Sequence, residues 1–189
     1  MDKIKITSPL DSGICSNLKA GDLVLLSGKI YTARDAAHLR LNDLISNGEP
    51  IPIDLKGQII YYAGPSPARP GSVIGACGPT TSYRMDDLTD PLFKLGLMGM
   101  IGKGDRSDAL IESMIAYGTV YFAAIGGAGA LISSCVKHSE VVAFEELGPE
   151  AIRCLDVEDM PVVVVIDSKG NNLYRSEPKK YRKQEGDLI

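Results

Sequence analysis

The stretch Gly78-Pro79-Thr80-Thr81-Ser82-Tyr83-Arg84-Met85 separates two segments of contrasting pattern. Residues 72–76 before it are short and apolar, as in a strand, and residues 85–100 after it carry apolar side chains at helical spacing. The pattern predicts a strand, a turn at Gly78-Pro79 and a helix. Three hydroxyls would lie in the first turn of that helix, where side-chain oxygens cap unpaired backbone N–H groups.

A helix that starts in this way has two interpretations. The backbone N–H groups and the dipole at a helix N-terminus favour an anion, and Arg84 can add a planar, bidentate contact to a carboxylate. The same residues also make an ordinary N-cap followed by a surface arginine. The octet alone does not decide between an anion site and a cap.

The composition is typical of a soluble globular protein. Of 189 residues, 44% are hydrophobic and 23% charged, and we expect one domain over residues 1–177 with a charged tail at 178–189. A formal net charge of −4 argues against non-specific nucleic-acid binding, which relies on excess basic charge. The N-terminus has no apolar signal-peptide core, and residues 119–133 are too short and glycine-rich to cross a membrane. We therefore expect a soluble, cytoplasmic protein.

The four cysteines are spread widely along the chain without a CxxC pair: Cys15, Cys77, Cys135 and Cys154. This spacing is neither a metal-ligand pattern nor a disulfide scaffold. We expect free, mostly buried thiols in a reducing cytosol, and no metal held by this chain alone.

Apolar periodicity divides the chain into alternating strands and helices. Strands are predicted at 2–6, 23–31, 58–63, 72–76, from 99 onward, and at 119–125, 140–145, 161–167 and 173–174. Helices are predicted at 32–46, 85–100, 108–117, 128–136 and 150–155. This alternation is typical of an α/β fold with a sheet covered by helices, and hairpin signals near both ends of the chain predict a mixed sheet.

Four strand-to-helix turns have a similar character. In open α/β sheets, ligands bind outside the strand ends, where helix N-termini point at them. The turns at 31–38, 78–85 and 102–107 together carry four cations on an acidic protein: Arg34, Arg84, Lys103 and Arg106. The turn at 125–130 has no charge but offers glycines and free N–H groups. Such a cluster suits a small anion with two or more carboxylates, or a phosphate.

The sequence gives little support to other kinds of site. Residues 102–107 lack the Walker spacing, and the glycines at 126–129 lack the GxGxxG spacing of a dinucleotide site. There is no GxSxG elbow, and only a spatial partner would activate Cys77. His38 either orients a ligand or is a satisfied structural histidine. The residues alone predict a domain that clamps a polycarboxylate, with a partner subunit supplying the rest of the site.

Four segments, in order along the chain, resemble the iron–sulfur hydro-lyases of the class I fumarase and L(+)-tartrate dehydratase type. They are LSGKIYTARDAAH at 26–38, YAGP at 62–65, GPTTSYRM at 78–85 and IGKG at 101–104. The resemblance runs from about residue 18 to residue 167. It is to the C-terminal domain, which in two-subunit members is a separate β subunit, and it implies the swivelling β/β/α fold.

The resemblance also implies a cofactor and a partner. In this family a [4Fe-4S] cluster with one open iron is held by cysteines of the other domain or subunit, and the iron acts as a Lewis acid. This chain would then be the cluster-free half, inactive without its α subunit, in a hetero-oligomer of the α2β2 type.

The same resemblance implies roles for individual residues. Thr80 would be the catalytic base, with its alkoxide stabilised by Arg84 or the substrate and an aspartate acid on the partner. The residues that would bind the substrate carboxylates are Arg34, Thr81, Arg84 and Lys103. Further candidates are Asp35, His38 and Arg106.

The implied reaction is the reversible hydration of fumarate to (S)-malate. The alternative within the family is dehydration of L(+)-tartrate to oxaloacetate, because these substrates are all C4 dicarboxylates and differ by one hydroxyl. A function of a different class, a non-catalytic carboxylate-binding module, is a third hypothesis.

Overall fold

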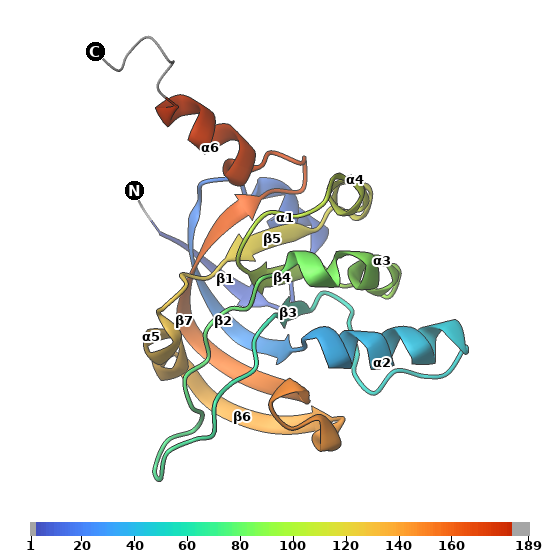
Figure 1. The fold of residues 1–189 in the computed structure, drawn as a ribbon. Coiled ribbons are helices and arrows are strands. Elements are labelled where there is room, and N and C mark those ends of the chain that lie inside the picture. Colours follow the sequence, from blue (N-terminus) through green and yellow to red (C-terminus); the bar gives the residue numbers. More distant parts are fainter. Residues whose placement is uncertain (1–2, 183–189) are drawn as a thin grey trace.

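A computed structural model describes residues 3–182 and contains one seven-stranded mixed sheet (Figure 1). The order across the sheet is β1-β2-β3-β4-β5-β7-β6. The strands are β1 (Ile4–Ser8), β2 (Leu23–Thr32), β3 (Ile59–Tyr61), β4 (Gly99–Gly102), β5 (Val120–Ala123), β6 (Val136–Ala143) and β7 (Ile152–Ile166). The predicted α/β class and the mixed sheet are both confirmed.

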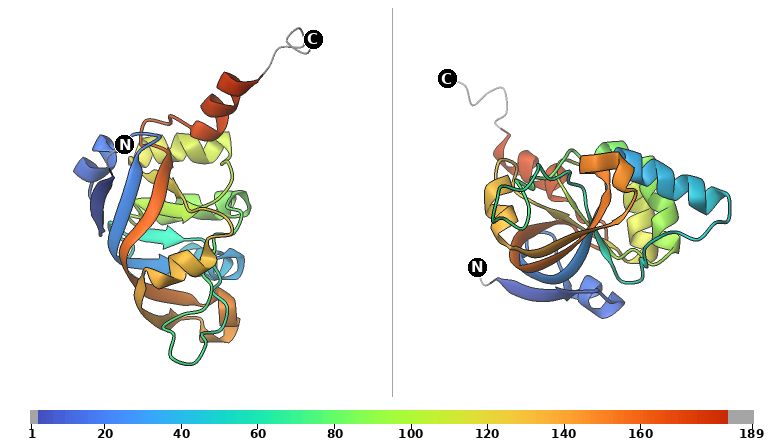
Figure 2. Two further views of the ribbon diagram at one scale, coloured as in Figure 1. Left: turned by 90° about the vertical axis from the view of Figure 1, so that its left-hand side faces the viewer. Right: turned by 90° about the horizontal axis from the view of Figure 1, so that it is seen from below.

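The sheet closes on itself through its two longest strands. β2 pairs in parallel with β1 and β3, and the parallel run continues through β4 to β5. β7 is antiparallel to β5 and β6, and it also pairs with β2 from Leu23 to Thr32. The pairings β2–β3–β4–β5–β7–β2 therefore form a ring, which the right-hand view in Figure 2 shows as a strongly curved sheet.

Three helices lie side by side on one face of this sheet, as Figures 1 and 2 show: α2 (Asp35–Ser46), α3 (Asp86–Lys94) and α4 (Asp108–Tyr117). The other helical segments are α1 (Ser12–Asn17), α5 (Gly129–Ser134), α6 (Leu173–Tyr181) and two 3-10 turns, η1 (Tyr83–Met85) and η2 (Glu145–Glu150). Residues 64–78 form a loop that extends away from the sheet in Figure 1.

Two apolar cores lie on opposite faces of the sheet. In β3, Ile59 and Tyr61 belong to the core inside the ring, whereas Ile60 belongs to the core under the helices. This alternation follows from the two-residue period of a strand, and a strand buried on both faces carries apolar residues at every position. The sequence QIIYYA at 58–63 shows that pattern.

Three predicted elements are wrong. Residues 72–76 form bends, not a strand, because no neighbouring strand pairs with them and Gly75 packs against the carbonyl of Ser66. Residues 150–155 are not a helix, because the end of a 3-10 turn is followed by β7 from Ile152, paired with β2 and β6. Residues 173–174 begin α6, because the side chain of Asn172 accepts from the N–H of Tyr174 and caps a helix there.

The start of α3 also differs from the prediction. Neither η1 nor α3 receives a side-chain hydrogen bond at its N-cap, so the hydroxyls of the octet do not cap this helix. α3 ends at Lys94 rather than near residue 100, because the chain turns at Gly96, whose φ of 93° is left-handed. The helix α6 extends to Tyr181, into the segment predicted as a tail, and residues 183–189 lie outside the described part.

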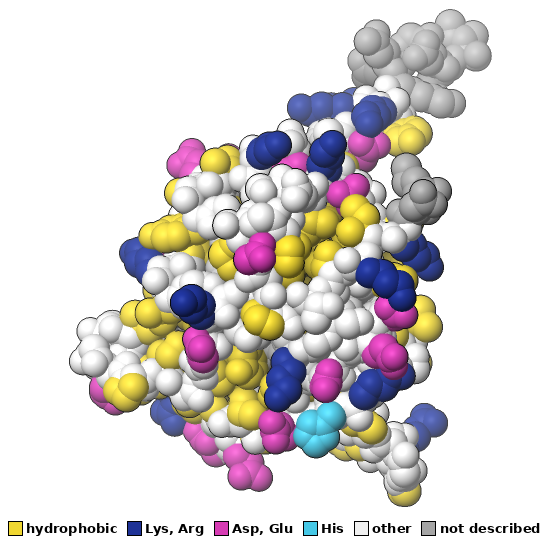
Figure 3. All heavy atoms as spheres, turned by 180° about the vertical axis from the view of Figure 1, so that it is seen from behind, with side chains coloured by type: hydrophobic (Ala, Val, Ile, Leu, Met, Phe, Trp, Pro, Cys, Tyr) yellow, Lys and Arg dark blue, Asp and Glu magenta, His cyan; other side chains and the backbone are white. Residues whose placement is uncertain are grey.

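The surface carries charges of both signs. On the face shown in Figure 3, acidic and basic side chains are interspersed around apolar areas and do not form one basic surface. No helix within residues 3–182 has the length and apolar character needed to cross a membrane.

Candidate active site

The sheet brings three of the predicted turns to one edge. The chain leaves β2 at Thr32 just before Arg34, and leaves β4 at Gly102 just before Lys103. The octet is held between them, because the N–H of Thr80 donates to the carbonyl of Tyr62 at 2.8 Å and Thr81 forms a parallel bridge with Lys103. Residues from three distant parts of the sequence therefore line the carboxyl ends of adjacent parallel strands.

Arg84 is the centre of the polar contacts in this group. Its Nε donates to Asp35 Oδ1 at 2.8 Å and its Nη2 to Asp35 Oδ2 at 3.1 Å, which is a bidentate ion pair. The same Nη2 lies 3.2 Å from Thr80 Oγ1. The guanidinium is thus oriented by a carboxylate on α2 and donates to the hydroxyl that the resemblance singles out.

The ion pair shifts the pKa values of both Asp35 and Arg84. The side-chain hydrogen bond from Arg84 is the largest cause of a lowered pKa at Asp35, and it outweighs the partial burial that acts to raise it. The hydrogen bond to Asp35 likewise raises the pKa of Arg84. Asp35 is therefore a carboxylate that holds Arg84, rather than an acid with a proton to donate.

Arg34 approaches the same group from the start of α2. Its Nη2 lies 3.6 Å from Glu150 Oε1 and 3.7 Å from Asp35 Oδ2. Its Nε is buried and has no hydrogen-bond partner among the described residues. The side chain passes so close to Gly64 that a Cβ at that position would lie 2.9 Å from Arg34 Nη1. The glycine of the YAGP segment therefore makes room for this arginine.

Glu150 is the contact that sequence reasoning missed. Besides its contact with Arg34, Glu150 Oε2 accepts from the N–H of Ala36 at 2.9 Å, in the first turn of α2. It stands 114 residues away in sequence, on the segment that was predicted to begin a helix, and no local motif marks it. Only the pairing of β7 with β2 brings it here.

Lys103 is exposed, and its backbone is tightly held. Its N–H donates to Ser82 Oγ at 3.1 Å, and its carbonyl accepts from the N–H of Ser82 at 3.0 Å. A Cβ at Gly126 would lie 3.9 Å from Lys103 Cδ, so the lysine stem runs beside the glycine turn after β5. In that turn, Gly129 packs against Gly78.

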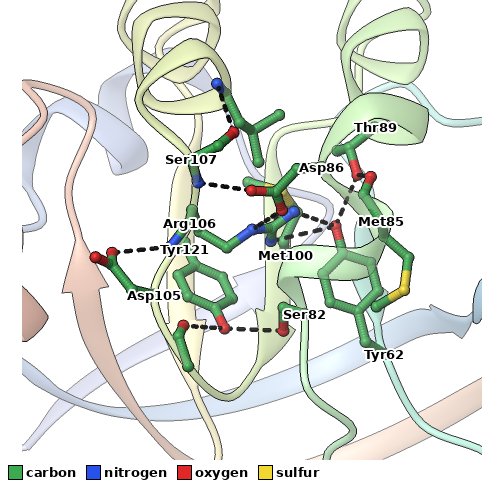
Figure 4. Close-up of polar contacts among 12 residues, drawn as sticks. Tyr62, Ser82, Met85, Asp86, Thr89, Met100, Asp105, Arg106, Ser107 and Tyr121 are labelled. Carbon is green, nitrogen blue, oxygen red and sulfur yellow. Dashed lines mark hydrogen bonds and ion pairs between the residues drawn. The ribbon is translucent and has the colours of Figure 1, made fainter.

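Arg106 is not brought to this group. It is 2% exposed, and its Nε donates to Asp86 Oδ1 at 2.7 Å. Its guanidinium lies between two tyrosine rings, 5.1 Å from the centroid of Tyr62 and 4.9 Å from that of Tyr121 (Figure 4). The structure thus places this candidate beneath the site as a structural cation.

His38 is also turned inward. Its Nδ1 donates to the carbonyl of Arg34 at 2.9 Å, and its ring packs edge-on against Tyr62 with centroids 5.4 Å apart. Burial lowers the pKa of His38 to about 4, against the opposing effect of that hydrogen bond. The imidazole is therefore neutral, and this geometry favours the structural interpretation of His38: it fixes the backbone that carries Arg34.

The cysteines of this chain do not suit a metal centre of its own. Cys15 and Cys77 are buried, and burial raises the pKa of each thiol to about 12, which opposes the thiolate that a metal needs. All four cysteines are free thiols, and within residues 3–182 no three metal-ligating side chains gather in one place.

Known proteins are similar in sequence to this chain over most of its length. The family model described as "Fumarase C-terminus" matches residues 1–177. The chain belongs to this family. It is 42% identical over 178 residues to the "Putative L(+)-tartrate dehydratase subunit beta" of Methanocaldococcus jannaschii, an alignment that covers 91% of both chains.

Two fumarate hydratases are similar but much longer. The chain is 37% identical over 177 residues to fumarate hydratase 2 of Leishmania major, covering 91% of this chain and 31% of that protein. It is 41% identical over 152 residues to the anaerobic class I fumarate hydratase of Escherichia coli, covering 79% of this chain and 28% of that protein. The chain thus spans less than a third of these two relatives, and the predicted family is confirmed.

Removal of the Asp86 charge tests the buried ion pair beneath the site. Asp86→Asn leaves the Arg106 cation buried without a counterion, so we expect the free energy of unfolding to fall by about 3 kcal/mol in urea denaturation. Lys5→Met is the control, because the Lys5–Asp159 pair is exposed and its loss should cost under about 1 kcal/mol. A loss below 1 kcal/mol for Asp86→Asn would contradict this role.

The buried His38 predicts a pH-dependent stability. The unfolded histidine titrates near pH 6.5 and the folded one near 4, so its stabilisation is complete above pH 6.5 and is lost as the pH falls toward 4. Between pH 7 and pH 5 this group should lower the free energy of unfolding by about 2 kcal/mol. His38→Asn retains an N–H donor but does not titrate, so the difference between the two pH values should shrink by that amount. An unchanged difference would show that His38 is not held neutral.

Proposed function

We propose that this chain is the β subunit of a hydro-lyase that reversibly hydrates fumarate to (S)-malate. The observation that carries the proposal is the position of Arg84. It is oriented by Asp35, donates to the Thr80 hydroxyl, and lies at the same edge of the sheet as Arg34 and Lys103. Two separated carboxylates of one small substrate match such a set of cations.

In this proposal the cations bind and orient the substrate. Within residues 3–182, the guanidinium of Arg34 lies 3.6 and 3.7 Å from two carboxylates without a hydrogen bond to either, and Lys103 has no ion pair, so both have donors to offer a substrate carboxylate. The hydroxyl of Thr81, on the segment bridged to Lys103, is the neutral donor of the set. Binding through charge-assisted hydrogen bonds fixes the carbon skeleton relative to Thr80.

In this proposal Thr80 transfers the proton that a substrate carbon gains in hydration and loses in dehydration. A threonine hydroxyl is a poor base on its own, and a cation that donates to its oxygen favours the deprotonated form. Arg84 Nη2, 3.2 Å from Thr80 Oγ1, supplies that interaction. In the hydration direction the Thr80 hydroxyl would give its proton to the substrate carbon, and in dehydration its oxygen would receive one.

We assign the [4Fe-4S] cluster to a partner α subunit, because the buried and scattered thiols of this chain do not fit one. When bound there, the cluster supplies a Lewis acid for the substrate hydroxyl. The assembly is then a hetero-oligomer of the α2β2 type, in which this chain alone is inactive. Four free thiols suit a reducing compartment, so a cytoplasmic location remains part of the proposal.

One observation favours a second substrate. The relative that is covered over 91% of its length is described as a tartrate dehydratase subunit beta, whereas the two fumarate hydratases described above are covered over less than a third. L(+)-Tartrate carries one hydroxyl more than malate, and a residue that reads this hydroxyl would discriminate strongly between them. The assay of the assembled enzyme therefore includes both substrates.

Loss of the Thr80 hydroxyl should affect turnover more than binding. Thr80→Val is nearly isosteric, so we expect kcat of the assembled enzyme to fall by about 10²–10⁴-fold with KM changed little, as for the loss of an acid–base group. Thr80→Ser should recover part of the rate. A Thr80→Val enzyme of near-normal kcat would remove Thr80 from the mechanism.

Arg84→Lys tests the bidentate geometry while keeping the charge. A lysine cannot contact both Asp35 oxygens and Thr80 in the same way, and we expect kcat/KM to fall about 10–100-fold, the loss typical of hydrogen bonds to charged groups. Arg40→Lys is the control, since Arg40 pairs with exposed Glu146 and should retain normal kinetics. Urea midpoints of all variants establish that the fold is intact. Equal kcat/KM values for the two variants would argue against the site.

A further inference from the structure

The C-terminal helix α6 is attached to the loop that carries Lys103. α6 has no fully buried residue, although Leu173 and Tyr174 pack against the core under the helices. Polar contacts around its first turn join it to the loop that carries Lys103. Asn172 Nδ2 donates to Asp105 Oδ1 at 2.7 Å, and Arg175 Nε donates to Asp105 Oδ2 at 3.0 Å. The other contacts are from Arg175 to the Arg106 carbonyl at 2.8 Å, from Arg175 to Asp108, and from the N–H of Gly104 to Tyr174 Oη at 3.0 Å.

These contacts add to others that already hold the turn at Lys103 and Gly104 from the side of the sheet. Inside, Ser82 pairs with the backbone of Lys103, and Tyr121 Oη lies 3.1 Å from the carbonyl of Gly104. Gly104 itself has a φ of 87°, so the chain reverses sharply directly after the lysine. The N–H of Gly104 donates to Tyr174 Oη, so α6 adds a contact to this peptide beyond those from Ser82 and Tyr121.

Charge is the second way in which α6 acts on Lys103. Burial acts to raise the pKa of Asp105, but hydrogen bonds from Asn172 and Arg175 outweigh it and keep the group ionised. Its charge is shared with Arg175. Without Arg175, this carboxylate would lose its ion pair, and the potential at the loop that carries Lys103 would become more negative and less favourable for a substrate anion.

We propose that Asp105, Tyr174 and Arg175 are positioning residues for Lys103, so that α6 sets the affinity of the site for one substrate carboxylate. The inference rests on the proposed function, because it takes Lys103 as a ligand of that carboxylate. None of the three residues contacts the reacting atoms in this account; they act through the turn at Gly104. They therefore affect how tightly Lys103 holds the carboxylate. Because that contact is the same in the bound substrate and in the transition state, we expect a change in KM rather than in kcat.

The test measures steady-state kinetics of the assembled enzyme with Arg175→Met. This substitution removes the charge and all side-chain N–H groups but keeps a long, unbranched side chain. We expect KM to rise about fivefold or more with kcat changed little, the signature of lost uniform binding. Tyr174→Phe, which removes only the acceptor of the Gly104 N–H, should raise KM by a smaller factor. Arg175→Lys should recover part of the affinity. Lys180→Met is the matched control on the same helix, because Lys180 pairs with Glu177 and with no other carboxylate among residues 3–182, and its kinetics should be those of the wild type.

A double substitution separates positioning from general loosening of the fold. If α6 acts through Lys103, Arg175→Met should raise KM in the wild-type background and have almost no further effect on KM in the Lys103→Ala background. A fall in kcat with unchanged KM, or KM effects that multiply in full in the double variant, would overturn the inference.

The outcome is also distinguishable from failure of the proposed function. A wild-type assembly without turnover of fumarate or tartrate would overturn the hydro-lyase proposal, and with it this one. An active wild-type assembly whose KM is unchanged by Arg175→Met and Tyr174→Phe would overturn only the role of α6. Hydrogen exchange of the Gly104 amide gives a second measurement: exchange that is no faster in Tyr174→Phe than in the wild type would contradict the contact itself.

Discussion

The buried ion pair between Arg106 and Asp86 is the interaction on which the site depends. The guanidinium lies between the rings of Tyr62 and Tyr121, and the second oxygen of Asp86 accepts from the N–H of Ser107 at 2.6 Å. One charge pair thus joins the residue after β3, the first residue of α3, β5 and the N-cap of α4. A buried pair of this kind costs desolvation of both ions, and that cost is offset only if the geometry and the additional hydrogen bonds are good. Here both conditions are met, so the pair fixes the turns above it.

The site above this pair is electrostatically incomplete within the described chain. Asp35 forms an ion pair with Arg84, and Glu150 lies 3.6 Å from Arg34. These carboxylates orient the two arginines, but they do not balance all the positive charge of Arg34, Arg84 and Lys103. A dicarboxylate would supply the missing negative charge. The group also has a proton-transfer candidate in Thr80, and in the proposed assembly a partner that brings a Lewis acid would complete it.

Elements that are determined by neighbouring residues in the chain could be predicted from the sequence. The helix at 108–117 was correct at both ends, because Ser107 caps its start and Gly118 ends it with a left-handed backbone. The convergence of Arg34 and Lys103 followed from the general geometry of parallel strands. Thr80 and Arg84 join them for a different reason, because the octet follows no strand and is held by the bond from the Thr80 N–H to the Tyr62 carbonyl and by the bridge between Thr81 and Lys103. What failed was decided by distant pairing: residues 72–76 have no strand partner, residues 152–155 are held extended by β2 and β6, and Glu150 arrives only through that pairing. The inward orientation of Arg106 was also out of reach, since an arginine beside a glycine turn looks the same in sequence whether it faces solvent or the core.

The most direct test of the central claim is a crystal structure of this chain assembled with its cluster-bearing partner, prepared anaerobically with a bound C4 dicarboxylate. We expect the guanidinium groups of Arg34 and Arg84 and the ammonium group of Lys103 to contact the two carboxylates, with Thr80 Oγ1 facing a carbon between them. A dicarboxylate bound elsewhere, or one whose carboxylates are held entirely by partner residues, would contradict it.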